Sequence, residues 1–158
     1  LGKPAPVSLG KAEMLRPGKD VALLALGSMV YPALKVADAL SRDGIEAMVV
    51  NARFVKPIDE TMARQAAQLG RIVTLEEAQI AGGFGSAVSE ALGAVGLSAV
   101  PHLSIGLPDK FIEHGKRHEL LKLGQLDVQS LTAQMTSWYH ATSRAPSAEL
   151  SLLTESSA

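Results

Sequence analysis

The sequence has no cysteine, few aromatic residues and almost no excess of charge of either sign. The lack of cysteine among its 158 residues excludes disulfides, thiolate nucleophiles and thiolate metal sites. A formal net charge of -1 leaves no broad basic surface for nucleic acid or for an anionic membrane. No apolar run approaches the roughly 20 residues that a membrane span requires. These absences predict a soluble, cytoplasmic protein with no nucleic-acid partner and no membrane partner.

The residues that are abundant are aliphatic. Hydrophobic residues make up 47% of the chain, with one Trp, two Tyr and three Phe among them. A core of Val, Leu, Ile and Ala is typical of α/β folds with close helix-sheet packing, and the length is that of one domain. Residues 1–10 are interpreted as an interdomain linker and not as a signal peptide, because no apolar segment precedes a cleavage-like site.

Strand and helix signals alternate along the chain. The run VALLAL over 21–26 predicts a strand that is buried on both faces. Further strands are expected over 11–16, 45–50, 71–75 and 100–105. Apolar residues at helical spacing predict helices over 31–42, 59–69, 84–95 and 127–139, with Asp59 and Asp127 as N-caps.

This order predicts a three-layer αβα sandwich. Its sheet would be mostly parallel, with about five strands and the first strand as an antiparallel edge. The domain would cover residues 11–139. Residues 140–158 are expected to be a disordered tail, because its three leucines contribute at most about 9 kcal/mol against roughly 1 to 2 kcal/mol for each residue ordered.

Open α/β sheets bind ligands or partners at the carboxyl ends of their strands, and four distinctive segments follow the predicted strands. The first, GSMVYP over 27–32, is either an anion-accepting helix N-terminus or, preferably, a simple connection capped by Ser28. The second, NARFVKP over 51–57, places Phe54 among cationic side chains. That arrangement is typical of an interface anchor, although a linker with solvated charges is the alternative.

The third segment, EEAQIAGGFGSAV over 76–88, contains a glycine-rich helix start. Its spacing does not match a dinucleotide fingerprint, because Val88 stands where a third small residue is needed. Glu76 and Glu77 are neighbours on a strand and point to opposite faces, so they do not form a carboxylate pair. One of them is instead expected to be a buried hydrogen-bond acceptor.

The fourth segment, GLPDKFIEHGKRHELL over 106–121, carries His114 and His118 four residues apart. Gly115 and the basic residues between the histidines argue against a metal pair, so a polar docking loop is the preferred interpretation. Ser86 lacks the turn pattern of a serine nucleophile. The residues alone therefore identify no catalytic centre and no metal site.

Taken together, the four segments resemble one family. The stretches GSMVYPALKVADAL, VVNARFVKPID, RIVTLEEAQIAGGFGSAV and IGLPDKFIEHGKRHELL are similar to the C-terminal domain of the 1-deoxy-D-xylulose 5-phosphate synthase family, over roughly residues 10–138. Two positions depart from the family pattern. Ala78 stands where Asn is frequent, and residues 124–127 carry one extra residue.

The resemblance implies a transketolase-type transferase with three domains that acts as a homodimer. Enzymes of that family condense pyruvate with glyceraldehyde 3-phosphate, with loss of CO2. The deoxyxylulose phosphate that they form is a precursor for isoprenoid, thiamine and pyridoxal synthesis. These enzymes use thiamine diphosphate and Mg held by the upstream domains, so the resemblance assigns no cofactor and no catalytic residue to this chain, which alone would be inactive. The implied contacts to other domains or to the dimer partner are Asn51, Arg53, Phe54, Lys56, Gly82, Gly83, Phe84, Gly85, Ser86, Asp109, Phe111, His114 and Gly115.

A second hypothesis is a free-standing regulatory domain that binds a small anion or a nucleotide near Gly27 and Gly83. It predicts a concave pocket with helix N-termini directed into it. The domain hypothesis instead predicts exposed apolar surface around Phe54, Phe84 or Phe111, which other domains would cover. The domain hypothesis is preferred because of the linker-like start and the set of four motifs, and the lack of a complete nucleotide signature adds to this preference.

Overall fold

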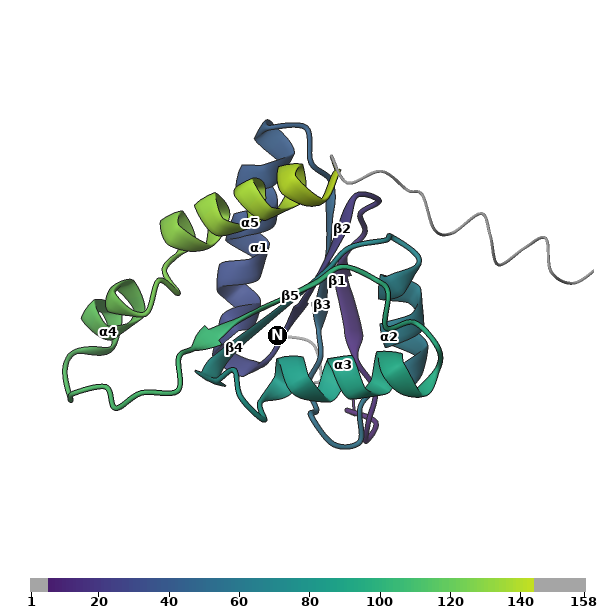
Figure 1. The fold of residues 1–158 in the computed structure, drawn as a ribbon, viewed down its shortest axis with the longest axis horizontal. Coiled ribbons are helices and arrows are strands. Elements are labelled where there is room, and N and C mark those ends of the chain that lie inside the picture. Colours follow the sequence, from purple (N-terminus) through teal and green to yellow (C-terminus); the bar gives the residue numbers. More distant parts are fainter. Residues whose placement is uncertain (1–5, 144–158) are drawn as a thin grey trace, which may run out of the picture.

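A five-stranded sheet in the order β1-β3-β2-β4-β5 organises the computed structural model, which describes residues 6–143 (Figure 1). The strands are β1 (Glu13–Arg16), β2 (Val21–Ala25), β3 (Ala47–Asn51), β4 (Ile72–Gln79) and β5 (His102–Leu107). β1 pairs antiparallel with β3, and the other pairs are parallel. The predicted α/β fold, a mostly parallel sheet with an antiparallel edge strand, is therefore confirmed.

Helices cover both faces of this sheet. They are the 3-10 turn η1 (Gly27–Met29) and the α-helices α1 (Val30–Arg42), α2 (Glu60–Ala67), α3 (Phe84–Ala94), α4 (Arg117–Leu123) and α5 (Val128–Ser143). Figure 1 shows α1 and α5 on one side of the sheet and α2 and α3 on the other, which completes the three layers. In the described part of the chain, no helix has the length and apolar character to cross a bilayer.

The central strand β2 explains why there are two apolar cores. All of its residues are buried, and successive side chains point to opposite faces of the sheet. Leu23 belongs to the cluster under α1 and α5, whereas Ala22 and Leu24 belong to the cluster under α2 and α3. A continuous apolar run such as VALLAL is therefore required by a strand with helices on both faces.

Two aspartates begin helices as predicted. The Asp59 carboxylate accepts a hydrogen bond from the Met62 amide at 3.2 Å and another from the Ala12 amide at 3.1 Å. These bonds satisfy a free donor at the start of α2 and tie that helix to the segment before β1. Asp127 does the same for α5, since its Oδ1 accepts from the amides of Gln129 and Ser130.

Two elements differ from the sequence-based expectation. β4 continues to Gln79 and does not stop at Leu75, and its pairing with β5 is irregular between these two residues. The polar residues Glu76 and Glu77 lie in this extension, so the apolar run that predicted the strand ends before it. α4 is absent from the predicted order, because none of its residues is fully buried and it therefore has no strong apolar stripe.

The last helix extends beyond the boundary expected at residue 139. α5 continues to Ser143, and its last turn is held by Arg71 of the loop before β4. The Arg71 guanidinium lies 4.9 Å from the Tyr139 ring centroid, and its Nε donates to the Thr142 hydroxyl at 3.1 Å. The rest of the expected disordered tail, residues 144–158, lies outside the described residues.

A polar contact joins α3 to the edge of the sheet. His102 begins β5, and its Nε2 lies 3.0 Å from the hydroxyl of the buried Thr74 on β4. Its Nδ1 lies 3.0 Å from the hydroxyl of Ser89 on α3. Burial lowers the pKa of His102 below its usual value of 6.5, since the charged form loses solvation there.

This lowered pKa predicts loss of stability in mild acid. Below about pH 6.5 the unfolded chain binds a proton at His102 before the folded chain does, so the free energy of unfolding falls by up to about 1.4 kcal/mol per pH unit. Above that pH both states are neutral at this residue and the contribution is complete. Urea unfolding at about pH 7.5 and about pH 5.5 measures the effect, and H102Q is expected to lose less stability between them. An equal loss in H102Q and the wild type would contradict this assignment.

Candidate functional site

The four segments singled out in the sequence lie along one edge of the sheet. They follow β2, β3, β4 and β5, which are parallel to one another, so the carboxyl ends of these strands meet at the same edge. This edge is where open α/β sheets place their functional groups. It is therefore the candidate functional surface of the domain.

A buried carboxylate occupies the N-terminus of α3. Glu76 is only 1% exposed, and its Oε2 and Oε1 accept hydrogen bonds from the amides of Phe84 at 2.7 Å and Gly85 at 2.9 Å. Gly83, at the N-cap position, supplies no side-chain cap. A residue of β4 thus satisfies the free donors of the helix, and its negative charge complements the positive end of the helix dipole. The expected buried acceptor is Glu76.

The glycines around this carboxylate are required by space. A Cβ at Gly83 would lie 2.2 Å from the Gln79 carbonyl oxygen and 2.3 Å from Glu76 Oε2. A Cβ at Gly85 would lie 2.5 Å from the Ser104 hydroxyl. These glycines let α3 approach β4 and β5 closely, and the anion-binding position at the helix start already holds a carboxylate. The glycine-rich start is a packing feature of the domain.

The neighbouring carboxylate, Glu77, points to the other face of β4 and binds two further segments. Arg117 of α4 donates to it through Nε at 3.0 Å and through a terminal nitrogen at 2.5 Å, and Ser28 donates at 2.5 Å. The hydrogen bonds from Arg117 are the main cause of the lowered pKa of Glu77, and Ser28 adds to it. The same pair raises the pKa of Arg117. The ends of β2 and β4 and the start of α4 are thereby linked.

The segment after β3 turns partly into the domain. The Arg53 guanidinium pairs with the Glu13 carboxylate of β1 at 2.5 Å. The backbone amide of Arg53 donates to Asn51 Oδ1 at 3.2 Å. Phe54 is half-buried and lines a shallow recess with residues of the α2 and α3 layer. Lys56 is exposed. Phe54 is therefore less available as an interface anchor than its flanking cations suggested.

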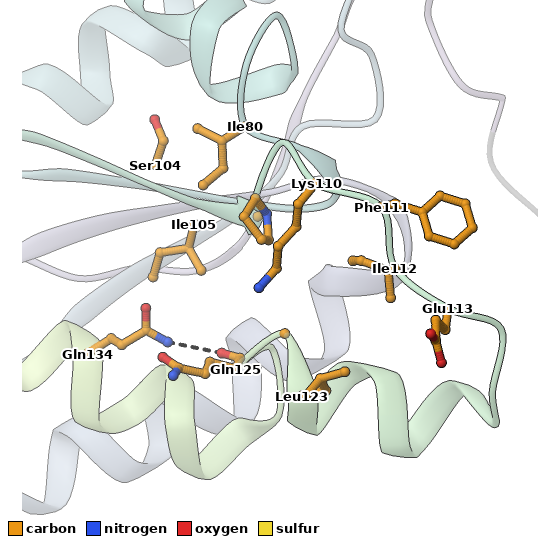
Figure 2. Close-up of a pocket in the computed structure, with 13 residues that line it drawn as sticks. Ile80, Ser104, Ile105, Lys110, Phe111, Ile112, Glu113, Leu123, Gln125 and Gln134 are labelled. Atoms are coloured by element: carbon orange, nitrogen blue, oxygen red, sulfur yellow. Dashed lines mark hydrogen bonds between the residues drawn. The ribbon is translucent and has the colours of Figure 1, made fainter.

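The segment after β5 leaves the body of the domain. We call residues 108–123 the arm; it consists of an irregular stretch and α4, and it projects from the sheet (Figure 1). Phe111 is 92% exposed. A cleft of about 520 Å³ separates the arm from β5 and α5 and is lined in part by Ile80, Ile105 and Gln134. Figure 2 shows Lys110 pointing into this cleft and Phe111 pointing away from it.

The structure divides the expected contact residues by exposure. Lys56, Gly82, Asp109, Phe111, His114 and Gly115 are exposed, and Asn51, Arg53, Phe54, Gly83 and Ser86 are half-buried. Exposed apolar surface was expected around Phe54, Phe84 or Phe111; Phe111 is exposed and Phe54 is half-buried, but Phe84 and Gly85 are buried inside the domain. The Phe84 ring instead fills the core beneath α3.

Two features of this surface were not predicted. The pairing of Glu77 with Arg117 spans 40 residues, and no local sequence signal indicates it. Leu123, 75% exposed at the end of α4, belonged to a helix that the apolar pattern did not reveal. His118 lies 3.8 Å from the carboxylate of its neighbour Glu119. Across residues 6–143, no three His, Asp or Glu side chains are grouped to hold a metal ion.

Comparison with known proteins identifies similar domains. The family model described as "Transketolase, C-terminal domain" matches residues 10–131. The 1-deoxy-D-xylulose-5-phosphate synthase of Thermomicrobium roseum is 47% identical over 135 residues, which cover 85% of this chain and 21% of that protein. The synthase of Desulforudis audaxviator is 58% identical over 113 residues, which cover 71% of this chain and 18% of that protein. The chain spans about a fifth of the length of these curated relatives.

Solved structures give the same fold. One described as a split gene transketolase, inactive beta4 tetramer, superposes with a TM-score of 0.78 at 33% identity, over 89% of this chain and 45% of that chain. The transketolase of Campylobacter jejuni superposes with a TM-score of 0.60 at 22% identity, over 87% of this chain and 20% of that chain. The second likeness concerns the fold alone.

The two adjacent glutamates are predicted to differ sharply in their effect on stability. E76A leaves two buried amides without an acceptor and opens a cavity, so the free energy of unfolding should fall by about 3 kcal/mol or more. E77A breaks a solvent-accessible pair and should cost about 1 kcal/mol or less. E76Q should lie between them, since one amide oxygen replaces two carboxylate oxygens. Urea unfolding of the three variants measures this order, and equal losses for E76A and E77A would refute it.

Proposed function

Because the chain belongs to the transketolase C-terminal domain family, we propose that it serves as the C-terminal domain of a 1-deoxy-D-xylulose-5-phosphate synthase. The observation that carries this proposal is the identity of 47% and 58% to two such synthases over most of this chain. The complete enzyme would condense pyruvate with glyceraldehyde 3-phosphate to 1-deoxyxylulose 5-phosphate and CO2. Such a reaction supplies isoprenoid precursors.

The proposed enzyme uses thiamine diphosphate with Mg, and we assign both to its other domains. The residues of this chain do not fit a diphosphate at the glycine-rich turn, because Glu76 holds the amides of Phe84 and Gly85 there. A phosphate at that position would meet a buried carboxylate, which repels it. The chain's own residues therefore contribute no step of the chemistry in this proposal, and the chain alone would be inactive.

The proposed role of this domain is structural. It would pack against the upstream cofactor-binding domains and support a homodimer through the strand-end surface. The exposed candidates on that surface are Lys56, Gly82, Asp109, Phe111, His114 and Gly115, and the half-buried ones are Asn51, Arg53, Phe54, Gly83 and Ser86. A cytoplasmic location is part of the proposal and accords with a chain that has no cysteine.

The regulatory alternative finds less support at the same edge. A site for a small anion near Gly27 would adjoin Glu77, whose carboxylate already accepts the Ser28 hydroxyl. A site near Gly83 would adjoin Glu76. Carboxylates at both helix starts favour a cationic or neutral partner over a phosphate or a nucleotide.

A two-piece activity assay tests the proposed function. The Desulforudis audaxviator synthase is truncated to remove the region that this chain matches, and deoxyxylulose phosphate formation is measured from pyruvate and glyceraldehyde 3-phosphate. The truncated synthase and the 158-residue chain should each be inactive alone. Their mixture should regain activity that saturates as the chain is added. Full activity of the truncated synthase, or an inactive mixture, would contradict the proposal.

A further inference from the structure

The arm has little internal support for its position. Residues 108–116 form neither a helix nor a strand, and α4 buries none of its side chains fully. Irregular segments placed on a rigid sheet are common sites of recognition. The position of the arm must therefore come from a few contacts at its base and from whatever covers its outer surface.

The contacts at the base are polar and specific. Arg117 binds Glu77 with two hydrogen bonds, and Ser28 holds the same carboxylate from the opposite segment. Just beyond the arm, the Gln134 side chain of α5 donates to the Gln125 carbonyl at 3.0 Å. These bonds fix both ends of α4 against the body of the domain. The irregular stretch before α4 is thereby held out from the sheet and not collapsed onto it.

The outer surface of the arm presents a large apolar side chain with a polar rim. The Phe111 ring points away from the cleft, as Figure 2 shows, and is 92% exposed. The nearby side chains of Asp109 and Glu113 are charged and exposed, whereas Lys110 points into the cleft. A central aromatic residue within a charged rim is the composition of an interface anchor.

We propose that the arm docks this domain onto the preceding domains of the synthase polypeptide, with Phe111 as the anchor that they enclose and the Glu77–Arg117 pair as the brace that positions it. The proposal rests on the proposed function. The occupant follows from size: the chain spans 21% and 18% of two synthase relatives, and the matching family model is that of a C-terminal domain. The remaining four fifths of such a polypeptide is covalently connected to this domain and is therefore the partner that we assign to the arm.

Binding of the full chain to the truncated Desulforudis audaxviator synthase tests the arm directly. Isothermal titration calorimetry should give F111A a dissociation constant at least about tenfold higher than that of the wild type, because a buried aromatic anchor is lost. F111W should bind within a few-fold of the wild type, since it keeps an aromatic anchor. M14A is the matched control, because Met14 is also exposed, at 45%, but lies on the edge strand β1. Its affinity should be unchanged.

The brace has its own test in the same titration. R117Q should weaken binding several-fold, and the charge swap E77R/R117E should restore part of the loss.

A stability control accompanies the F111A titration. F111A should keep the melting temperature of the wild type, because the Phe111 side chain is exposed, so weaker binding cannot be due to unfolding.

The outcomes separate the two proposals. Wild-type affinity in F111A would overturn the docking arm and leave the proposed function intact. Absence of any complex with the wild-type chain would overturn both. Self-association of the isolated chain is measured by analytical ultracentrifugation. If F111A abolishes this self-association but binds the truncated synthase normally, the proposal is also overturned, because Phe111 would then contact a second copy of this chain.

Discussion

The interaction on which this structure depends is the buried Glu76 carboxylate bound to the first amides of α3. It joins β4 to the start of α3, one of the two helices that cover this face of the sheet. The close approach admits only glycine at positions 83 and 85, where a Cβ would overlap neighbouring atoms. One hydrogen-bonded charge thus sets the packing of α3, the composition of the turn and the character of the strand-end surface. A helix start that normally attracts anions is already satisfied from within the fold.

The next residue uses the same strand geometry in the opposite direction. Neighbouring residues on a strand point to opposite faces of the sheet. Glu76 therefore points toward α3, whereas Glu77 points to the other face and binds Ser28 and Arg117. One carboxylate stabilises the fold, and the other holds the arm beside the sheet. The edge of the sheet that serves as a ligand site in many α/β proteins is converted here into a surface that presents Phe111. This arrangement accords with the structural role proposed for the domain.

Much of this was readable from the sequence where the signal is local. VALLAL indicated the central strand, Asp59 and Asp127 indicated helix starts, and the alternation of strands and helices gave the parallel sheet. The adjacency of the two glutamates was enough to predict that one is buried. α4 was missed because it buries no residue fully, so no apolar period marks it. The pairing of Glu77 with Arg117 was beyond reach, because two residues 40 positions apart meet only once the fold exists.

The most direct test of the central claim is hydrogen–deuterium exchange of the chain, free and bound to the truncated synthase. The claim is that the edge at the carboxyl ends of the strands is the contact surface. Binding should slow exchange in residues 108–123 and 51–56 and leave the loops at the opposite edge, residues 17–20, 43–46 and 96–101, unchanged. Slower exchange confined to those opposite loops, with no change in the arm, would contradict it.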